Sequence, residues 1–271
     1  MKYEIVLQGG FANQLFQIAN AIKLHPEHDK AKFIINISNY KSYFRSEYIT
    51  KLFPSLIEDI IDTPRNFRRL HLKNFINADF CLIKEDSPFI RKQVTQKMIT
   101  VSYVIQNGYF QNSDIASVSG ILLAGMKEFA AATRFVEPHE VAIHIRRGDY
   151  LTNTTVEVPR DEYYFYAIDL IRNKFDAPEF TVFSDDVNYA HRLFENTEIK
   201  EYVDPNKLTD VHDFVFMSKF QKYIISNSSY SYAASLINSK PDIVISPAMW
   251  TKKNSTLSTD LVHDKLLCLE I

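Results

Sequence analysis

The stretch from Val141 to Tyr150 reads VAIHIRRGDY, an apolar run that ends in two arginines, a glycine and an aspartate. Further apolar runs follow along the chain, and a segment with helical spacing separates each run from the next. Strands that alternate with helices in this way form right-handed β-α-β units around a parallel sheet. We predict strands at residues 141–145, 180–183, 199–203, 222–226 and 242–246, and helices at 161–175, 187–195, 210–219 and 229–238.

The N-terminal part of the chain begins with the same alternation, and only short helices are expected over residues 40–98. Pro138 has polar neighbours and is the best candidate for a linker. We therefore predict an α/β fold of two Rossmann-like halves that face a cleft, an N-terminal half over residues 1–136 and a C-terminal half with a parallel sheet over 137–271. In the first half we predict strands at residues 3–7, 33–37 and 99–105, and helices at 13–23 and 114–129.

Composition and motifs exclude several classes of protein. The 271 residues carry 31 Lys+Arg against 33 Asp+Glu, so the chain lacks the basic excess of a nucleic-acid-binding protein. None of the 6 glycines is followed by lysine and none stand in G-x-G-x-x-G spacing, which excludes a Walker P-loop and a dinucleotide fingerprint. The patterns H-E-x-x-H, C-x-x-C and Asp-x-Asp are absent as well, and we predict no metal site.

Polar side chains follow three of the predicted strands. The carboxyl ends of parallel strands lie at one edge of a sheet, where open α/β sheets bind ligands. Arginine forks and the exposed amides of a helix N-terminus suit a nucleotide with its phosphates. Each group also has an ordinary explanation, as a surface ion pair or as a helix cap. The candidates are His144, Arg146 and Arg147 after the first strand, Ser184, Asp185 and Asp186 after the second, and Asn227, Ser228 and Ser229 after the fourth.

The N-terminal half has its own polar cluster at its first turn. Gly9 and Gly10 permit a sharp turn from strand to helix in which the backbone comes close to a partner, and Asn13 is the expected N-cap. Gln14 and Gln17 share a helical face that suits the hydroxyl groups of a sugar. The alternative is a purely structural turn. Residues 108–111, Gly-Tyr-Phe-Gln, form a weaker polar and aromatic edge of the same kind.

Read in order, these segments resemble the α-1,2-fucosyltransferases of glycosyltransferase family 11 in their bacterial form. His144 to Tyr150 is the most specific of them, and residues 212–236 are similar to a family block that contains NSTFSWW and ends in AWL. The chain departs from the family at Phe11-Ala12, where Leu-Gly is usual, and at Tyr232-Ala233, where the family has two tryptophans. These departures bear on the acceptor, since the motif for the donor is intact.

The resemblance implies a GT-B-like enzyme that transfers L-fucose from GDP-β-L-fucose to the 2-hydroxyl of a galactose, with inversion and without a metal cofactor. The C-terminal half would hold the donor, with Arg146 and Arg147 meeting the charge of the departing GDP together with the helix N-terminus at Asn227 to Ser229. His144 and either Asp185 or Asp186 would contact ribose or guanine. Gly10, Asn13, Gln14 and Gln17 would lie on the acceptor side.

An inverting transfer also needs a base that activates or orients the acceptor hydroxyl. Asp149 is the candidate because it stands beside the arginines, and Glu157 is the reserve. The alternative for Asp149 is that it only braces Arg146 or Arg147.

The expected partners are GDP-fucose and a galactose-terminated oligosaccharide, either free or lipid-linked as in O-antigen synthesis. We expect a cytoplasmic enzyme, either soluble or peripheral at the inner membrane, with Cys81 and Cys268 as buried thiols. The basic stretch Arg65 to Lys73 is either a solvated helix face or a membrane contact. Two other functions stay open, an inverting transferase with another nucleotide sugar or linkage, and a non-catalytic sugar- or nucleotide-binding protein.

Overall fold

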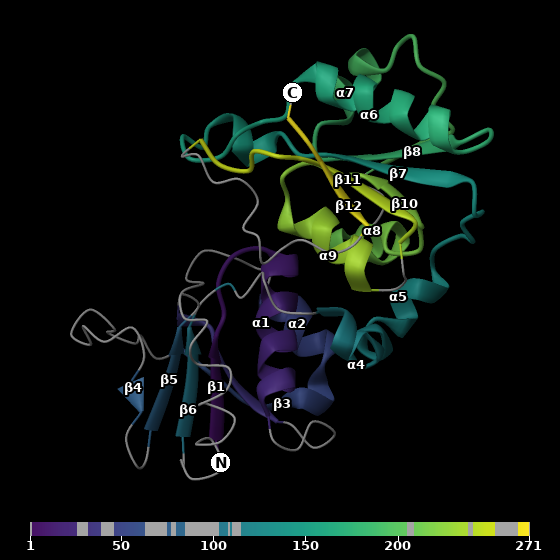
Figure 1. Ribbon diagram of the computed structural model, residues 1–271. Coiled ribbons are helices and arrows are strands. Elements are labelled where there is room, and N and C mark those ends of the chain that lie inside the picture. The colour runs from purple at the N-terminus through teal and green to yellow at the C-terminus, as the bar shows by residue number, and fades with distance from the viewer. Residues whose placement is uncertain are drawn as a thin grey trace. The chain divides into compact units, whose positions relative to one another are not determined.

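The computed structural model divides into two compact units, Met1–Gly125 and Met126–Ile271. Each unit contains a sheet with helices packed against it (Figure 1). The structure describes residues 2–25, 32–38, 46–62, 75–76, 80–84, 103–107, 109, 115–204, 209–237, 241–252 and 265–270.

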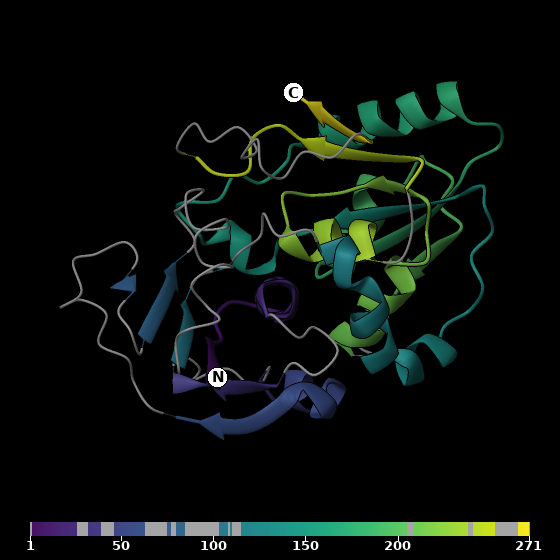
Figure 2. The same cartoon turned by 60° about the horizontal axis from the view of Figure 1, so that its bottom comes forward.

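The N-terminal unit is built on a six-stranded sheet. Its strands are β1 (Lys2–Val6), β2 (Phe33–Asn36), β3 (Ile57–Ile61), β4 (Phe75–Ile76), β5 (Phe80–Lys84) and β6 (Tyr103–Asn107). Its helices are α1 (Phe11–Leu24), α2 (Ser46–Leu52), the short 3-10 helices η3 (Pro54–Leu56) and η6 (Ile115–Val118), and α4 (Ser119–Gly125). The strand order is β3-β2-β1-β6-β5-β4, and every pair is parallel except β4 with β5 (Figure 2).

Helix α1 is held on this sheet by buried polar side chains as well as by its apolar face. Gln106 of β6 donates to the carbonyl of Gln17 and accepts from the Asn20 amide, at 2.7 and 2.9 Å. Tyr3 of β1 donates to the same Gln106 side chain at 3.0 Å. A single glutamine therefore ties two neighbouring strands to the helix that follows the first of them.

The expectation of helices alone over residues 40–98 is wrong, because β3, β4 and β5 lie there beside α2. Strand β3 reads IEDII and is mostly exposed, and β4 has two residues, so neither gives a clear apolar period. The predicted helix at 114–129 is divided into η6, α4 and α5 (Lys127–Ala131). It breaks after Gly125, where a Cβ atom would lie 2.5 Å from the Leu52 carbonyl oxygen.

The C-terminal unit contains a second six-stranded sheet, and here the predicted strands and helices are confirmed. The strands are β7 (Glu140–Ile145), β8 (Glu179–Ser184), β9 (Glu201–Val203), β10 (Lys222–Ile224), β11 (Ile243–Pro247) and β12 (Leu266–Leu269), the last of which was not predicted. The helices that follow β7 are η7 (Gly148–Leu151), α6 (Asp161–Lys174), α7 (Val187–Leu193), α8 (Asp210–Met217) and α9 (Ser229–Ile237). The order is β12-β11-β10-β7-β8-β9 with every pair parallel.

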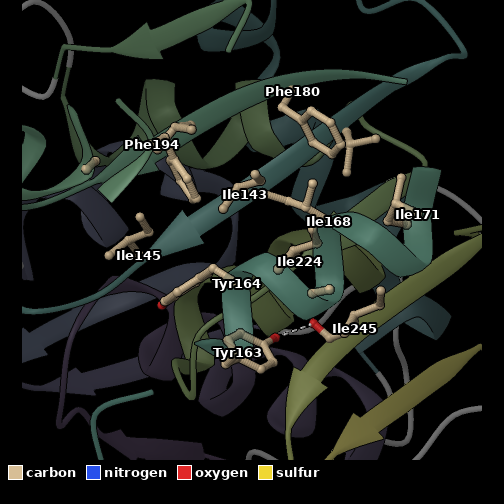
Figure 3. Close-up of a cluster of buried hydrophobic side chains, with 14 of the residues drawn as sticks. Ile143, Ile145, Tyr163, Tyr164, Ile168, Ile171, Phe180, Phe194, Ile224 and Ile245 are labelled. Atoms are coloured by element: carbon tan, nitrogen blue, oxygen red, sulfur yellow. Dashed lines mark hydrogen bonds between the residues drawn. The ribbon is translucent and has the colours of Figure 1, made fainter. Parts of the chain in front are cut away.

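The two faces of this sheet are covered by different helices. In Figure 1, α6 and α7 lie over one face, and α8 and α9 lie over the other. All six residues of β7 are buried, and four of them are apolar, the exceptions being Glu140 and His144. Ile143 and Ile145 pack into a cluster with Tyr163 and Ile168 of α6 (Figure 3), whereas His144 points to the opposite face. The Tyr163 hydroxyl donates to the carbonyl of Ile225, directly after β10, at 2.6 Å and to that of Ile245, in the middle of β11, at 3.0 Å.

The segment that precedes β7 belongs to the C-terminal unit. Arg134 donates two hydrogen bonds of 2.8 and 2.9 Å to the buried carboxylate of Glu140 and two of 2.8 and 3.0 Å to Glu201. Lys219 donates to the carbonyls of Ala130, Thr133 and Arg134. The units therefore divide after Gly125, ahead of the predicted boundary between residues 136 and 137.

The expectation that Cys268 is buried is wrong, since it is exposed. It lies on β12, which is the outermost strand of the sheet in the part of the chain that the structure describes and is largely exposed. Within the described part of the chain, no helix is both long and apolar enough to span a membrane.

Candidate functional site

The three predicted polar strand ends meet at one edge of the C-terminal sheet. Strand β7 lies between β8 and β10, and both pairs are parallel. The residues after β7 therefore have the residues after β8 on one side and those after β10 on the other. The contacts described below join all three segments, as the topology predicts.

Arg146 is held by two carboxylates. Its Nη1 lies 3.0 Å from Oδ2 of Asp185, and its Nη2 lies 2.6 Å from Oδ1 of Asp149. Burial lowers the pKa of the guanidinium, but the charges of Asp185 and Asp149 outweigh burial and raise the pKa above its ordinary value. The alternative for Asp149, that it braces an arginine, is thus an observed contact, although its side chain is 67% exposed.

Arg147 is held differently. Its guanidinium carbon lies 3.6 Å from the centre of the Tyr189 ring, and its Nε is 3.8 Å from Oδ2 of Asp186. That Nε atom is buried and has no hydrogen-bond partner in the described part of the chain. The backbone N–H of Arg147 donates to Oδ1 of Asp185 at 2.8 Å, so Asp185 anchors both arginines.

The residues after β8 divide into a cap and an anchor. Asp186 is the N-cap of α7, and its Oδ1 accepts from the Tyr189 backbone N–H at 3.0 Å. Ser184 accepts from the Asp186 backbone N–H, also at 3.0 Å. The ordinary capping role therefore holds for Asp186, whereas Ser184 bonds to the backbone of that cap and Asp185 holds the arginines.

His144 is buried beneath this edge of the sheet. Its Nδ1 lies 3.0 Å from the Ser226 hydroxyl, and its ring centre lies 5.7 Å from that of Tyr230. Burial, with a smaller contribution from the Arg146 charge, lowers its pKa to about 3, so the ring is neutral near pH 7. The sequence prediction missed Ser226 and Tyr230; Ser226 directly precedes the predicted group at 227–229, and that position was its only signal.

Asn227 connects three loops. Its Nδ2 donates to the carbonyls of Trp250, at 2.9 Å, and of Glu157. The Tyr150 hydroxyl donates to the Asn227 carbonyl at 3.3 Å. The Oδ1 atom of Asn227 is buried and accepts no hydrogen bond from the residues that the structure describes. Glu157, the reserve base, is thereby tied through its backbone to the segment that leads into α9.

The N-terminus of α9 lies at the same edge. Ser228 precedes the helix and caps it, since its hydroxyl accepts from the Tyr230 backbone N–H at 3.3 Å. Ser229 is the first residue of α9. The amides of this first turn and the two guanidinium groups thus belong to adjoining segments of the sheet edge.

The first turn of the N-terminal unit differs in part from the prediction. Gly9 adopts φ +76°, and a Cβ atom there would lie 2.3 Å from Nδ2 of Asn13 and 2.7 Å from the Tyr109 ring. This confirms the expected sharp turn and brings Tyr109 beside it. Gly10, and not Asn13, is the N-cap of α1, because the helix begins at Phe11.

Two glutamines of this cluster are buried. The Gln14 amide donates to the Gly9 carbonyl at 3.3 Å. The Gln17 amide donates to the carbonyl of Gln8 at 3.0 Å and accepts from its N–H at 3.2 Å. Both side chains therefore hold the turn, and their contact with a sugar stays a prediction.

Some predicted features lie outside the described residues, namely Gly108, Phe110, Gln111 and the basic stretch from Arg65 to Lys73. Among the side chains that the structure describes, no group of three or more His, Cys, Asp or Glu residues is arranged to hold a metal ion.

Comparisons with known proteins agree with the resemblance seen in the sequence. An α-1,2-colitosyltransferase of Escherichia coli is 26% identical over 97% of each chain, and the O-antigen biosynthesis glycosyltransferase WbnK of the same organism is 26% identical over 92% of this chain and 95% of its own. Among solved structures, E. coli ADP-heptose LPS heptosyltransferase II matches with a TM-score of 0.50 at 9% identity, over all of this chain and 91% of its own. That match confirms the predicted GT-B-like α/β fold class. The model of glycosyl transferase family 11 matches residues 2–260, and the chain belongs to that family.

Proposed function

We propose that the protein transfers L-fucose from GDP-β-L-fucose to the 2-hydroxyl of a galactose at a glycan end, with inversion. The observation that carries the proposal is the pair Arg146 and Arg147 at the end of β7, anchored by Asp185 beside the first turn of α9. Guanidinium groups and helix amides stabilise the negative charge that develops on a departing diphosphate. In this proposal the arginines supply the positive charge that offsets it, and no metal cofactor is required.

The nucleoside part of the donor would lie along the same edge, with His144 and Asp185 or Asp186 close to ribose or guanine. Since His144 is neutral, one ring nitrogen donates and the other accepts. The buried Oδ1 of Asn227 offers an acceptor to a hydroxyl or N–H group of a ligand. Leaving such an atom without a donor costs about 1–3 kcal/mol, which a bound nucleotide would recover.

We assign the base to Asp149, with Glu157 as the reserve. Asp149 is exposed at the sheet edge and pairs with Arg146 through one oxygen, so its second oxygen is available to a hydroxyl group. On the acceptor side we keep Gly10, Asn13, Gln14 and Gln17 as the proposed residues.

The setting we propose is O-antigen synthesis, which the name of one 26%-identical relative supports. The acceptor would then be carried on a lipid at the cytoplasmic face of the inner membrane, with the enzyme soluble or peripherally attached.

The test is a nucleotide panel followed by a transfer assay. GDP, and not UDP or ADP, should raise the melting temperature in the presence of a chelator. GDP-fucose should then release GDP with a galactoside acceptor, and NMR of the product should show an α-1,2 linkage. Stabilisation by UDP alone would refute the donor assignment, and an Arg146→Ala variant that folds and keeps full transfer would refute the role of that residue.

A second candidate is transfer of another sugar by the same chemistry. It is supported by the relative named as an α-1,2-colitosyltransferase and by Tyr232-Ala233 in place of the usual two tryptophans. The same assay with the GDP derivatives of fucose and colitose side by side separates the two candidates, because the true donor should show the higher kcat/KM.

A further inference from the structure

The two arginines at the end of β7 are held by different kinds of partner. The close partners of Arg146 are the carboxylates of Asp185 and Asp149, at 3.0 and 2.6 Å, and its guanidinium carbon is 5.5 Å from the centre of the Tyr150 ring. Arg147 lies instead over the ring of Tyr189, with its guanidinium carbon 3.6 Å from the ring centre. Its nearest carboxylate, that of Asp186, is 3.8 Å away and already caps α7.

These partners leave the arginines in different electrostatic states. A carboxylate offsets the positive charge of an arginine and occupies its N–H groups. An aromatic face attracts the cation without adding a negative charge, and the donors at the rim of the guanidinium plane stay available. One of these donors, Nε of Arg147, is buried and has no hydrogen-bond partner among the residues that the structure describes.

The ring of Tyr189 is itself fixed at both ends. Its backbone N–H donates to the side chain of Asp186, and its hydroxyl donates to Oδ1 of Asp161 at the start of α6. Burial and this bond to Asp161 raise the pKa of Tyr189 to about 12, so the hydroxyl keeps its proton near pH 7. Neither Tyr189 nor Asp161 belongs to the polar strand ends that the sequence pattern singled out.

We propose that Tyr189, fixed by Asp161, is a positioning residue that holds the Arg147 guanidinium for the diphosphate of the nucleotide donor. The inference rests on the proposed function, because it takes the diphosphate as the ligand of this arginine. The competing explanation is structural, since Tyr189 also packs against the buried cluster of the C-terminal unit.

A double-mutant cycle separates the two explanations. GDP affinity would be measured by calorimetry on the full chain for Tyr189→Leu, Tyr189→Phe, Arg147→Ala and the double variant Arg147→Ala/Tyr189→Leu. Tyr166→Leu is the matched control, because Tyr166 lies on α6 and is 53% exposed. Tyr189→Leu keeps an apolar side chain against the core, and Tyr189→Phe keeps the ring as well.

We expect Tyr189→Leu to weaken GDP binding roughly five- to thirty-fold, the range that a cation–π contact supports. Tyr189→Phe should lose less, and the double variant should bind no more weakly than Arg147→Ala. In the transfer assay, KM for the donor should rise more than kcat falls. Tyr166→Leu should match the wild type.

Two results would overturn the inference while the proposed function stands. The first is a Tyr189→Leu protein that binds GDP within twofold of the wild type. The second is a double variant in which the GDP affinity falls by the product of the two single losses, because Tyr189 would then act independently of Arg147. A wild-type protein that binds no GDP would overturn the proposed function, and this inference would fall with it.

Discussion

The Oδ2 atom of Asp185 lies 2.6 Å from the position that a Cβ atom on Gly148 would occupy. A side chain at Gly148 would meet this carboxylate, and the backbone there is not left-handed, since Gly9 is the positive-φ glycine among the described residues. The same carboxylate accepts the Arg147 backbone N–H and pairs with Arg146. The glycine thus makes room for the group that anchors both arginines.

Gly148→Ala should therefore damage the site. The methyl group would displace Asp185, and we expect at least tenfold weaker GDP binding together with a loss of about 1–2 kcal/mol in the free energy of unfolding. Calorimetry and urea denaturation measure the two effects. Gly120→Ala on α4 is the matched control, because nothing lies within 4 Å of its Cβ position, and it should stabilise the protein by about 0.5–1 kcal/mol. Unchanged binding in Gly148→Ala would show that Asp185 is free to move.

Asp149→Asn should separate the two roles considered for this residue. As the base, Asp149 contributes to kcat, and we expect its loss to lower kcat on the order of 10²-fold or more. GDP affinity should change little, because Asp185 still holds Arg146. Steady-state kinetics and calorimetry give the two numbers, with Glu157→Gln as the comparison. The opposite pattern, weaker GDP binding with kcat intact, would make Asp149 a brace only.

His144 should make the fold sensitive to mild acid. Burial lowers its pKa from the ordinary value of 6.5 to about 3 in the folded protein, so only the unfolded chain binds a proton between these values. The stability that it contributes is complete above pH 6.5 and is lost as the pH falls toward 3, by up to about 1.4 kcal/mol per pH unit. Urea denaturation at pH 7.5 and 5.0 should show about 2 kcal/mol more loss in the wild type than in His144→Gln. Equal losses would mean that the ring is protonated in the folded protein.

Arg134→Met should destabilise the C-terminal unit. The side chain of Glu140 has no exposed surface, and Arg134 donates two hydrogen bonds to its carboxylate. Removal of the arginine therefore leaves a buried carboxylate without these bonds. Breaking such a pair costs about 3–5 kcal/mol, reduced here because Lys200 lies 3.3 Å from the same carboxylate. Lys127→Met, an exposed change on α5, is the control.

A fragment from Met126 should fold, and one from Glu137 should be markedly less stable by circular dichroism. Equal stability of the fragments would show that the segment before β7 is dispensable.

The fold of the C-terminal unit could be predicted because its central strands are buried on both faces. Strand β7 is buried throughout, so it is mostly apolar in the sequence, with Glu140 and His144 as the exceptions. Strands β3 and β12 escaped prediction because they lie at sheet edges and are largely exposed, which removes the apolar signal. The exposed Cys268 follows from the same edge position.

The candidate site could be predicted only to the level of its segments. Parallel topology brings the three strand ends together whatever their side chains do. It does not say that Asp185 holds arginines while its neighbour Asp186 caps a helix, because that depends on the rotamers of adjacent side chains. Tyr189 and Ser226 were missed for a related reason, since their partners come from another strand end and no sequence spacing reveals them.

Asp185 and Tyr189 hold the arginines through contacts within the protein itself, so the site that we propose for an anion is preorganised. A free arginine side chain has about 2 kcal/mol of rotamer entropy, and ligands that must order such chains lose affinity. Here that entropy is lost during folding, so nucleotide binding need not supply it. Inorganic pyrophosphate alone should consequently compete with GDP. Its entropy of binding should be less unfavourable in the wild type than in a variant that lacks one of the contacts holding an arginine.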